Sequence, residues 1–254
     1  MSPAASQPDA AHRFSDVAGW QLLELGAVDS TSFVAAKLGA WQAVRADTQT
    51  AGRGRFQRSW VSDAGGLWLS AVVPTGADRE RWQALPLVAG LAVIQSLMGL
   101  GLASARLRWP NDIMVNERKL AGLLVDTFQP QLAVIGLGVN VTNHPAAHDP
   151  ALKETSIRLA DLVSQPPSLS ALTAAILASL KSAVDVMAKA GFSALQPRIN
   201  QLWGGARRVT VDLDGVQRSG SFTGIDEAGR LLLQDDTLGP TAFQPHQVRL
   251  LREL

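Results

Sequence analysis

The sequence contains no cysteine and carries almost no net charge, and each deficit excludes a class of protein. Without cysteine, the 254-residue chain cannot form a disulfide framework, a cysteine metal site or a thiolate nucleophile. The absence of cysteine is consistent with a reducing compartment, and we expect a cytoplasmic protein. Lysine and arginine number 23 against 22 acidic residues, which gives a net charge of +1. General binders of nucleic acid or of membrane surfaces usually carry a basic excess, so we expect neither as a partner.

Two stretches lack the pattern of a targeting or membrane segment. Residues 1–20 have no continuous apolar run, which predicts a tail or a short lead-in strand and not a signal peptide. They are also too short for a helix-turn-helix module. Residues 82–105 are uncharged and long enough for a membrane span, but Pro86 and several glycines interrupt them. Apolar residues recur there at helical spacing, which indicates a buried helix with a stripe formed by Leu87, Leu91, Ile94 and Met98.

The most informative stretch is Ala51–Trp60, called here the Arg-Gly loop, in which three arginines and two glycines fall within seven residues. Glycine lets backbone N–H groups approach a ligand, and the arginine fork matches carboxylate or phosphate oxygens. The loop is neither a Walker loop, since no Gly-Lys-Ser/Thr follows, nor the dinucleotide motif Gly-x-Gly-x-x-Gly. Taken alone, it fits an anion site, a solvated basic loop or a short RNA-binding tract equally well.

Polar groups also follow predicted strands. A strand over 22–28 ends at Asp29–Ser32, whose hydroxyls either cap the helix expected over 33–38 or bind a polar ligand. Further strands are expected over 41–46, which leads to Gln49, and over 67–73. The sequence therefore places a cluster of hydroxyl and amide groups just ahead of the Arg-Gly loop.

A second polar group follows the strand that begins at residue 106 and that Pro110 stops. Asn111 and Asp112 form either an Asx turn or an orienting amide and a carboxylate for Mg²⁺. A hairpin is expected over 113–126, in which Lys119 is either edge protection or a functional cation, and Gly122 indicates close approach of a ligand or backbone. The next strand, 133–141, is either an ordinary packed strand or a floor beneath a flat ligand; its unusual residues are Gly136, Gly138 and Asn140.

The rest of the chain predicts helices and then short strands. His144 and His148 are spaced i, i+4, but neighbouring prolines argue against a helix, so a surface loop is favoured over a metal site. Helices are expected over 156–162 and 168–189, the second capped by Ser168 and stopped by Gly191. Alternating segments then predict a small barrel with strands over 209–213, 220–225, 230–234 and 247–251. The fold class is α+β: a mixed or antiparallel sheet packed with helices, followed by that barrel.

In their order along the chain, the motifs resemble those of the biotin–protein ligases (biotin–[acetyl-CoA-carboxylase] ligases) over about residues 28–141. Any one motif is weak, but the shared order and separations are specific. The motifs are Asp29-Ser30-Thr31-Ser32, Gln49 with Ala51-Gly52-Arg53-Gly54-Arg55, Arg58, Trp60, Arg108-Trp109-Pro110-Asn111-Asp112, Lys119-Leu120-Ala121-Gly122 and Gly136 to Asn140. The resemblance implies a tail over 1–20, a class II synthetase-like catalytic domain over 21–203 and an SH3-like β-barrel over 204–254, in a monofunctional form without a DNA-binding module.

The resemblance also implies an activity. The enzyme would form biotinyl-5′-AMP from biotin and ATP with Mg²⁺, and transfer biotin to a lysine of a biotin carboxyl carrier protein. Fixed cations and Mg²⁺ would reduce the repulsion between the biotin carboxylate and the α-phosphate, and an ordered Arg-Gly loop would keep water from the mixed anhydride. The sequence leaves homodimer formation open.

The family implies residue roles as well. The implied catalytic residues are Lys119, Arg53 and Asp112, and Asp112 is also the implied Mg²⁺ ligand. The implied biotin-binding residues are Ser30, Thr31, Ser32, Gln49, Gly52, Arg53, Gly54, Arg55, Trp60, Lys119, Gly122, Gly136 and Gly138. The implied ATP- or AMP-binding residues are Arg53, Arg55, Arg58, Trp60, Asn111, Lys119 and Asn140.

Three positions depart from the family pattern. Ser32 stands where the family usually has asparagine, Gln57 where it has glycine, and Arg108 where it often has lysine. If position 57 needs a positive φ, Gln57 carries a steric cost. The alternatives kept open are a lipoate- or octanoate-type acyl ligase or transferase, a non-catalytic biotin or nucleotide sensor, and an RNA binder that uses the Arg-Gly loop.

Overall fold

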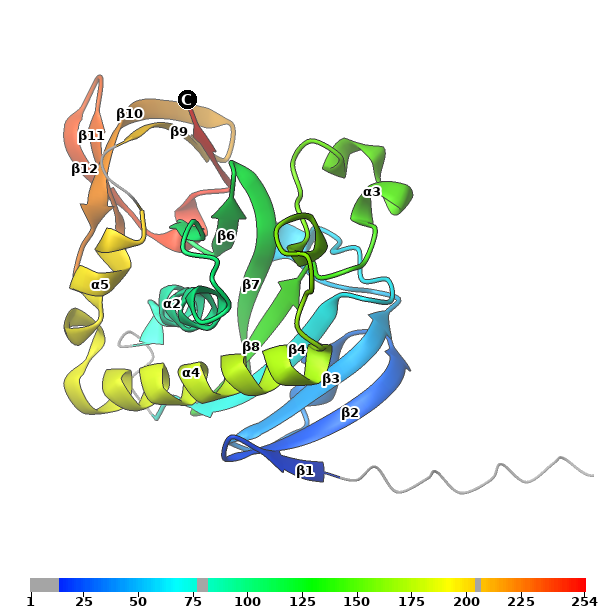
Figure 1. Cartoon of the computed structure of the whole chain (residues 1–254). Coiled ribbons are helices and arrows are strands. Elements are labelled where there is room, and N and C mark those ends of the chain that lie inside the picture. The colour runs from blue at the N-terminus through cyan, green and yellow to red at the C-terminus, as the bar shows by residue number, and fades with distance from the viewer. Residues whose placement is uncertain (1–13, 77–81, 204–206) are drawn as a thin grey trace, which may run out of the picture.

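The computed structural model describes residues 14–76, 82–203 and 207–254, which contain an eight-stranded and a five-stranded β-sheet (Figure 1). The order in the large sheet is β1-β2-β3-β4-β8-β7-β6-β5. Its strands are β1 (Phe14–Val17), β2 (Trp20–Val28), β3 (Gln42–Gln49), β4 (Leu67–Pro74), β5 (Arg106–Arg108), β6 (Asp112–Val115), β7 (Arg118–Gln129) and β8 (Leu132–Val139). Only β2 and β3 pair in parallel, so the sheet is mixed, as predicted.

The large sheet has an apolar core on each face. Leu22 belongs to the larger core and its neighbour Leu23 to the smaller, because successive side chains of a strand point to opposite faces. The short helix α1 (Thr31–Ala35) covers the smaller core. The helices α2 (Leu85–Met98) and α4 (Leu169–Ala190) pack on one another over the larger core, and Figure 1 shows α4 running across this face.

Both long helices are core helices. In α2, the predicted stripe is buried at Leu87, Leu91 and Ile94, but Met98, in the last turn, is 48% exposed. Within the described chain, α4 alone has the length and apolar composition of a membrane span. Its apolar face is buried against α2 and the sheet, so its composition is accounted for by packing. Ser168 caps α4 by accepting a bond from Ala171 N, and Gly191 ends it at φ +80°, as predicted.

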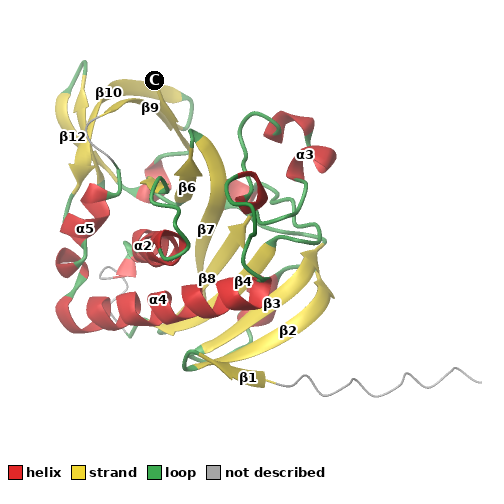
Figure 2. Ribbon diagram, viewed as in Figure 1, coloured by secondary structure: helices red, strands yellow, loops and turns green. Residues whose placement is uncertain are grey.

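The C-terminal residues form an antiparallel sheet in the order β12-β11-β10-β9-β13. Its strands are β9 (Arg207–Leu213), β10 (Val216–Ile225), β11 (Leu231–Asp235), β12 (Gly239–Phe243) and β13 (Leu250–Glu253). Figure 2 shows this small curved sheet beside α2 and α5 (Gln196–Gln201). Four of these strands match predicted strands, and β12 was not predicted. The strand β13 begins three residues after the predicted start at residue 247, because 245–247 form a 3₁₀ turn.

Two helix predictions between the sheets were wrong. Pro145–His148 does form a short helix, α3, because proline is favourable at the first helical position. Conversely, the helix predicted over 156–162 is reduced to a 3₁₀ turn at Leu159–Asp161, since Ser156 instead forms a parallel bridge with Lys119. Further 3₁₀ turns in the described residues are η1 (Arg55–Gln57), η3 (Pro150–Leu152) and η5 (Phe192–Ala194).

The predicted tail already contributes to the sheet. β1 lies within residues 1–20 and pairs with β2, which matches the lead-in strand allowed for this segment. Residues 1–13 lie outside the described structure, and so do residues 204–206, at which the predicted boundary between the two domains falls. The division into a catalytic domain over 21–203 and a small domain over 204–254 stays a prediction.

Candidate active site

A cavity of about 450 Å³ opens between the Arg-Gly loop, strands β6 to β8 and the ends of both sheets. Its size suits a small-molecule site. Segments far apart in sequence meet here, as the family-like order of motifs predicts. The predicted site residues that line it are Ser30, Thr31, Ser32, Gln49, Arg53, Gly54, Arg55, Arg58, Trp60, Asn111, Asp112, Lys119, Gly122, Gly136, Gly138 and Asn140. Gly52 stands behind the lining, where a Cβ would lie 2.4 Å from the carbonyl oxygen of Trp60.

The Arg-Gly loop folds back on itself over the cavity. Gly54 N donates to Arg58 O at 2.7 Å and Trp60 N to Gly52 O at 2.9 Å, which closes the loop as a narrow hairpin. At its tip, Phe56 and Gln57 both have positive φ, 54° and 60°. A non-glycine residue pays steric strain there, which the hydrogen bonds that close the loop must offset.

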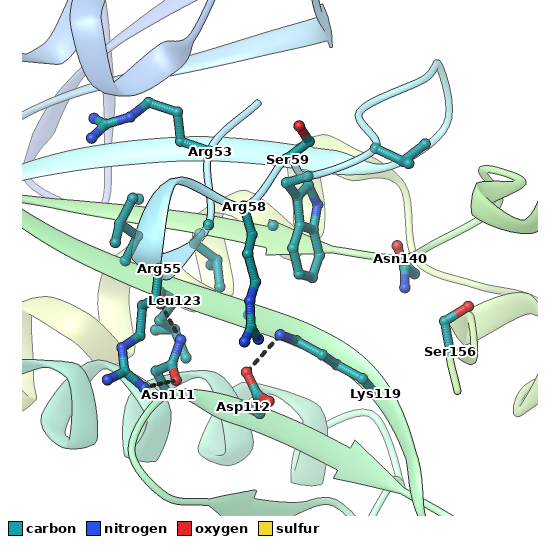
Figure 3. Close-up of a pocket in the computed structure, with 18 of the residues that line it drawn as sticks. Arg53, Arg55, Arg58, Ser59, Asn111, Asp112, Lys119, Leu123, Asn140 and Ser156 are labelled. Carbon is teal, nitrogen blue, oxygen red and sulfur yellow. Dashed lines mark hydrogen bonds and ion pairs between the residues drawn. The ribbon is translucent and has the colours of Figure 1, made fainter. Parts of the chain in front are cut away.

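Charges of opposite sign meet at Asp112, on the first residue of β6. Lys119 Nζ lies 2.6 Å from Asp112 Oδ1 (Figure 3). Arg108 Nη2 lies 2.8 Å from Asp112 Oδ2. Burial would raise the pKa of Asp112, but the two cations outweigh it and hold that pKa below its usual value. Asp112 is therefore an anion that keeps two cations in place at one end of the cavity.

Arg55 joins the Arg-Gly loop to the C-terminal sheet. Its guanidinium donates to the main-chain carbonyls of Pro245 and Val248, the latter at 3.1 Å, and to Asn111 Oδ1 at 3.4 Å. Burial lowers the pKa of Arg55 to about 10, although Asp112 opposes this shift. The side chain still carries its charge near neutral pH.

The opposite end of the cavity is a network of hydroxyl and amide groups. Gln49 Oε1 accepts bonds from Thr31 N at 2.8 Å and Thr31 Oγ1 at 3.0 Å, and Gln49 Nε2 donates to Ser62 Oγ at 2.9 Å. Gln49 thus caps α1. Of the two alternatives for the hydroxyls, capping is contradicted at Ser30, which occupies the N-cap without a side-chain bond. Ser70 Oγ, 2.8 Å from Thr31 Oγ1, completes the network and was missed in the sequence.

The glycine strand floor carries the indole of Trp60. A Cβ on Gly122 would lie 2.8 Å from Trp60 Cζ3, and one on Gly138 would lie 2.5 Å from Trp60 Nε1. Lys119 Nζ lies 4.9 Å from the centre of the indole, close enough for a cation–π interaction. The flat group above these two glycines is therefore a side chain of the protein itself.

Asn140 is held in a buried chain of amides. Its Oδ1 accepts from Asn143 Nδ2 at 3.1 Å, and its Nδ2 donates to Ile157 O at 3.4 Å. Ile157 N in turn donates to Lys119 O at 3.0 Å, while Lys119 N donates to Thr155 O at 2.8 Å. The backbone of Lys119 is thereby fixed from the segment that follows β8.

Comparison with known proteins decides the family. The Biotin/lipoate A/B protein ligase family matches residues 32–140. The biotin–[acetyl-CoA-carboxylase] ligase of Mycobacterium tuberculosis is 35% identical over 195 residues, which cover 74% of this chain and 71% of the relative. The ligase of the same name from Paracoccus denitrificans is 32% identical over 246 residues, 87% of this chain and 95% of the relative. This chain belongs to the biotin/lipoate protein ligase family.

A solved member of this ligase family has the same fold. The biotin protein ligase from Aquifex aeolicus, in complex with biotin and ATP, superposes with a TM-score of 0.81 and 24% identity, covering 92% of this chain and 99% of that chain. The predicted mixed sheet packed with helices is confirmed, and the short C-terminal strands predicted to form a small barrel form a five-stranded antiparallel sheet.

The three departures from the ligase pattern have structural outcomes. Gln57 does take the positive φ that the family glycine indicated. Arg108 keeps an ion pair with Asp112. Ser32 Oγ lies 3.4 Å from Ser70 Oγ, so it stays part of the hydroxyl network.

Proposed function

We propose that this chain is an ATP-dependent biotin–protein ligase that forms biotinyl-5′-AMP and transfers biotin to a lysine of a biotin carboxyl carrier protein. The observation that supports this most directly is one cavity with two chemically different ends. Hydroxyl and amide groups around Thr31 and Gln49 suit a neutral, hydrogen-bonding ring, and the cations around Asp112 suit a carboxylate and phosphates.

In the first half-reaction, a carboxylate oxygen of biotin attacks the α-phosphorus of ATP. The bond from that phosphorus to the bridging oxygen breaks, and pyrophosphate leaves. We assign Lys119 to the α-phosphate oxygens, on which negative charge develops, and Arg58 to the other phosphates, while Arg55, held by the carbonyls of Pro245 and Val248, keeps the loop beside them. The 2.6 Å contact of Lys119 with Asp112 supports this assignment, because it fixes the ammonium group in advance.

In the second half-reaction, the neutral ε-amine of an acceptor lysine attacks the acyl carbon of biotinyl-5′-AMP. An amide forms, AMP leaves with the electrons of the acyl–oxygen bond, and the proton of the amine passes to solvent. No nucleophile of the enzyme is needed. The hairpin of the Arg-Gly loop supports a role in excluding water, which would otherwise hydrolyse the anhydride.

Mg²⁺ belongs to the same proposal. Among the residues that line the described cavity, no three His, Cys, Asp or Glu side chains are grouped as a protein-only metal site. Mg²⁺ commonly binds through one or two carboxylates together with phosphate oxygens and water, and Asp112 with Asn111 fits that donor set. A bound Mg²⁺ ion would neutralise phosphate charge. Asp112 would then bind the ion in place of one of its two present partners, Lys119 or Arg108.

The test is pyrophosphate release from ATP and Mg²⁺ by the purified chain, with biotin, lipoate and octanoate compared as the acid. We expect release with biotin, followed by biotin attachment when a carrier domain with its acceptor lysine is added. Faster release with lipoate or octanoate would assign the lipoate-type activity instead. Biotin binding without release would indicate a sensor. Chelation of Mg²⁺ should stop release, and cell fractionation would test the proposed cytoplasmic location.

A further inference from the structure

The guanidinium of Arg53 is engaged away from the other cations of the cavity. Its Nη1 donates to Asp126 Oδ2 at 2.8 Å. Its Cζ lies 4.9 Å from the centre of the Phe33 ring and 6.0 Å from that of Phe128. Figure 3 shows the Arg53 side chain pointing away from Lys119. The side chain that family resemblance assigns to the reacting anions is thus occupied by other partners.

Those partners belong to the scaffold. Asp126 and Phe128 lie on β7, where Asp126 is in register with Val134 of β8, and Phe33 lies in α1. The two phenylalanine rings contact one another edge to face, with centres 6.2 Å apart. The side chains of the ion pair are 34% and 25% exposed, so partial burial strengthens the attraction beyond that of a fully exposed pair.

We propose that Asp126 is a positioning residue that, with Phe33 and Phe128, holds Arg53 and so keeps the Arg-Gly loop closed over the acyl-adenylate. The inference rests on the proposed function and refines it. Arg53 would then contribute by holding the Arg-Gly loop in position and not by contacting phosphate. The next residue, Gly54, lines the cavity. Anchoring the Arg53 side chain to β7 therefore also holds this part of the cavity wall in place.

The first experiment measures how long the intermediate is retained. The full chain is loaded with labelled biotin and ATP, excess unlabelled biotin is added, and loss of labelled biotinyl-5′-AMP from the protein is followed. Asp126→Asn should speed this loss about three- to tenfold, as expected for one partly shielded ion pair with cation–π support. Single-turnover pyrophosphate release should change less, because Asp126 does not touch the reactants. Asp126→Glu should restore most of the retention.

A double-mutant cycle separates holding the loop from contacting the ligand. If Arg53 acts through Asp126, Arg53→Ala should add little in the Asp126→Asn background. Additive effects, or a far larger effect of Arg53→Ala, would assign Arg53 to the ligand and overturn the inference. The matched control is the Arg208–Asp236 pair, 2.7 Å apart on the C-terminal sheet; Asp236→Asn should leave retention unchanged.

Hydrogen exchange tests the contact without relying on catalysis. In ligand-free protein, the backbone amides of residues 52–60 should exchange faster in Asp126→Asn than in the wild type, whereas those of β4 should not change. Equal exchange in both proteins would refute the role of Asp126. Faster exchange in a chain that forms no adenylate would support the loop contact and refute the ligase proposal, so the two failures are distinguishable.

Discussion

The indole of Trp60 lies so close to Gly138 that a Cβ on the glycine would stand 2.5 Å from Trp60 Nε1. Replacing Gly138 by alanine must therefore displace the indole and, with it, the end of the Arg-Gly loop. We expect Gly138→Ala to lower the free energy of unfolding by about 1–3 kcal/mol, and to reduce adenylate formation about tenfold or more. Urea unfolding and pyrophosphate release measure the two effects.

Gly26→Ala is the matched control for this substitution. Gly26 also lies in a strand of the large sheet, and a Cβ built on it meets nothing within 4 Å. Its alanine variant should keep wild-type stability within about 0.5 kcal/mol. Wild-type pyrophosphate release by Gly138→Ala would show that the indole moves aside freely.

Lys119→Ala should reduce pyrophosphate release about 100-fold or more, because a fixed cation that meets charge developing at phosphorus is lost. Lys189→Ala, at the exposed end of α4, serves as the control and should turn over normally. Binding of biotin alone, measured by calorimetry, should change much less than release. Wild-type turnover in Lys119→Ala would remove this residue from the mechanism.

Asp112 should make the free energy of unfolding depend on pH in the acid range, and Lys119 should set the size of that dependence. Burial raises the pKa of Asp112, and Lys119 with Arg108 more than reverses this. Because its folded-state pKa is below the usual 3.8, the carboxylate stabilises the fold above that value and ceases to do so as pH falls through its lowered pKa. In Lys119→Met that pKa rises, so the gap between the folded and unfolded pKa of Asp112 narrows. Less stability should then be lost in acid, and the loss should be complete at a higher pH.

Thermal midpoints recorded from about pH 7 down to about pH 3 would check this shift. Adding Asp112→Asn to Lys119→Met removes the titrating group, so the difference in acid sensitivity should disappear. Identical acid profiles for the wild type and Lys119→Met would mean that the ion pair does not set the pKa of Asp112.

Asn143 should matter for stability although it makes no predicted ligand contact. It is fully buried; its Nδ2 donates to Asn140 Oδ1 at 3.1 Å and its Oδ1 accepts from Val141 N at 2.9 Å. Asn143→Ala leaves both partners unpaired and should cost about 1–3 kcal/mol in urea unfolding. The adjacent Thr142→Ala removes one exposed bond, to Gly65 O, and should cost less than about 1 kcal/mol.

Local signals in the sequence predicted much of the fold. The cap at Ser168 and the stop at Gly191 delimit α4, as the sequence predicted. The missed strand β12 contains Pro240, which argues against a strand, but β12 lies at the edge of its sheet, where a missing backbone donor is tolerated.

The site was predicted as a set of residues but not as a set of contacts. Every residue of β4 from Leu67 to Val73 is buried, so no alternation singled out Ser70 as a partner of Thr31. Likewise, nothing near Arg53 in the sequence points to Asp126, 73 residues away. Such pairings follow from strand register, which is fixed only when the whole sheet is assembled.

The guanidinium of Arg55 binds Pro245 and Val248 through their main-chain carbonyls, a group that all amino acids possess. These contacts do not depend on side-chain identity and require only that the backbone follows the same path. Exchanges of residue type along 245–248 should consequently leave these two contacts of Arg55 intact as long as that path survives, whereas inserting or deleting a single residue there would break them.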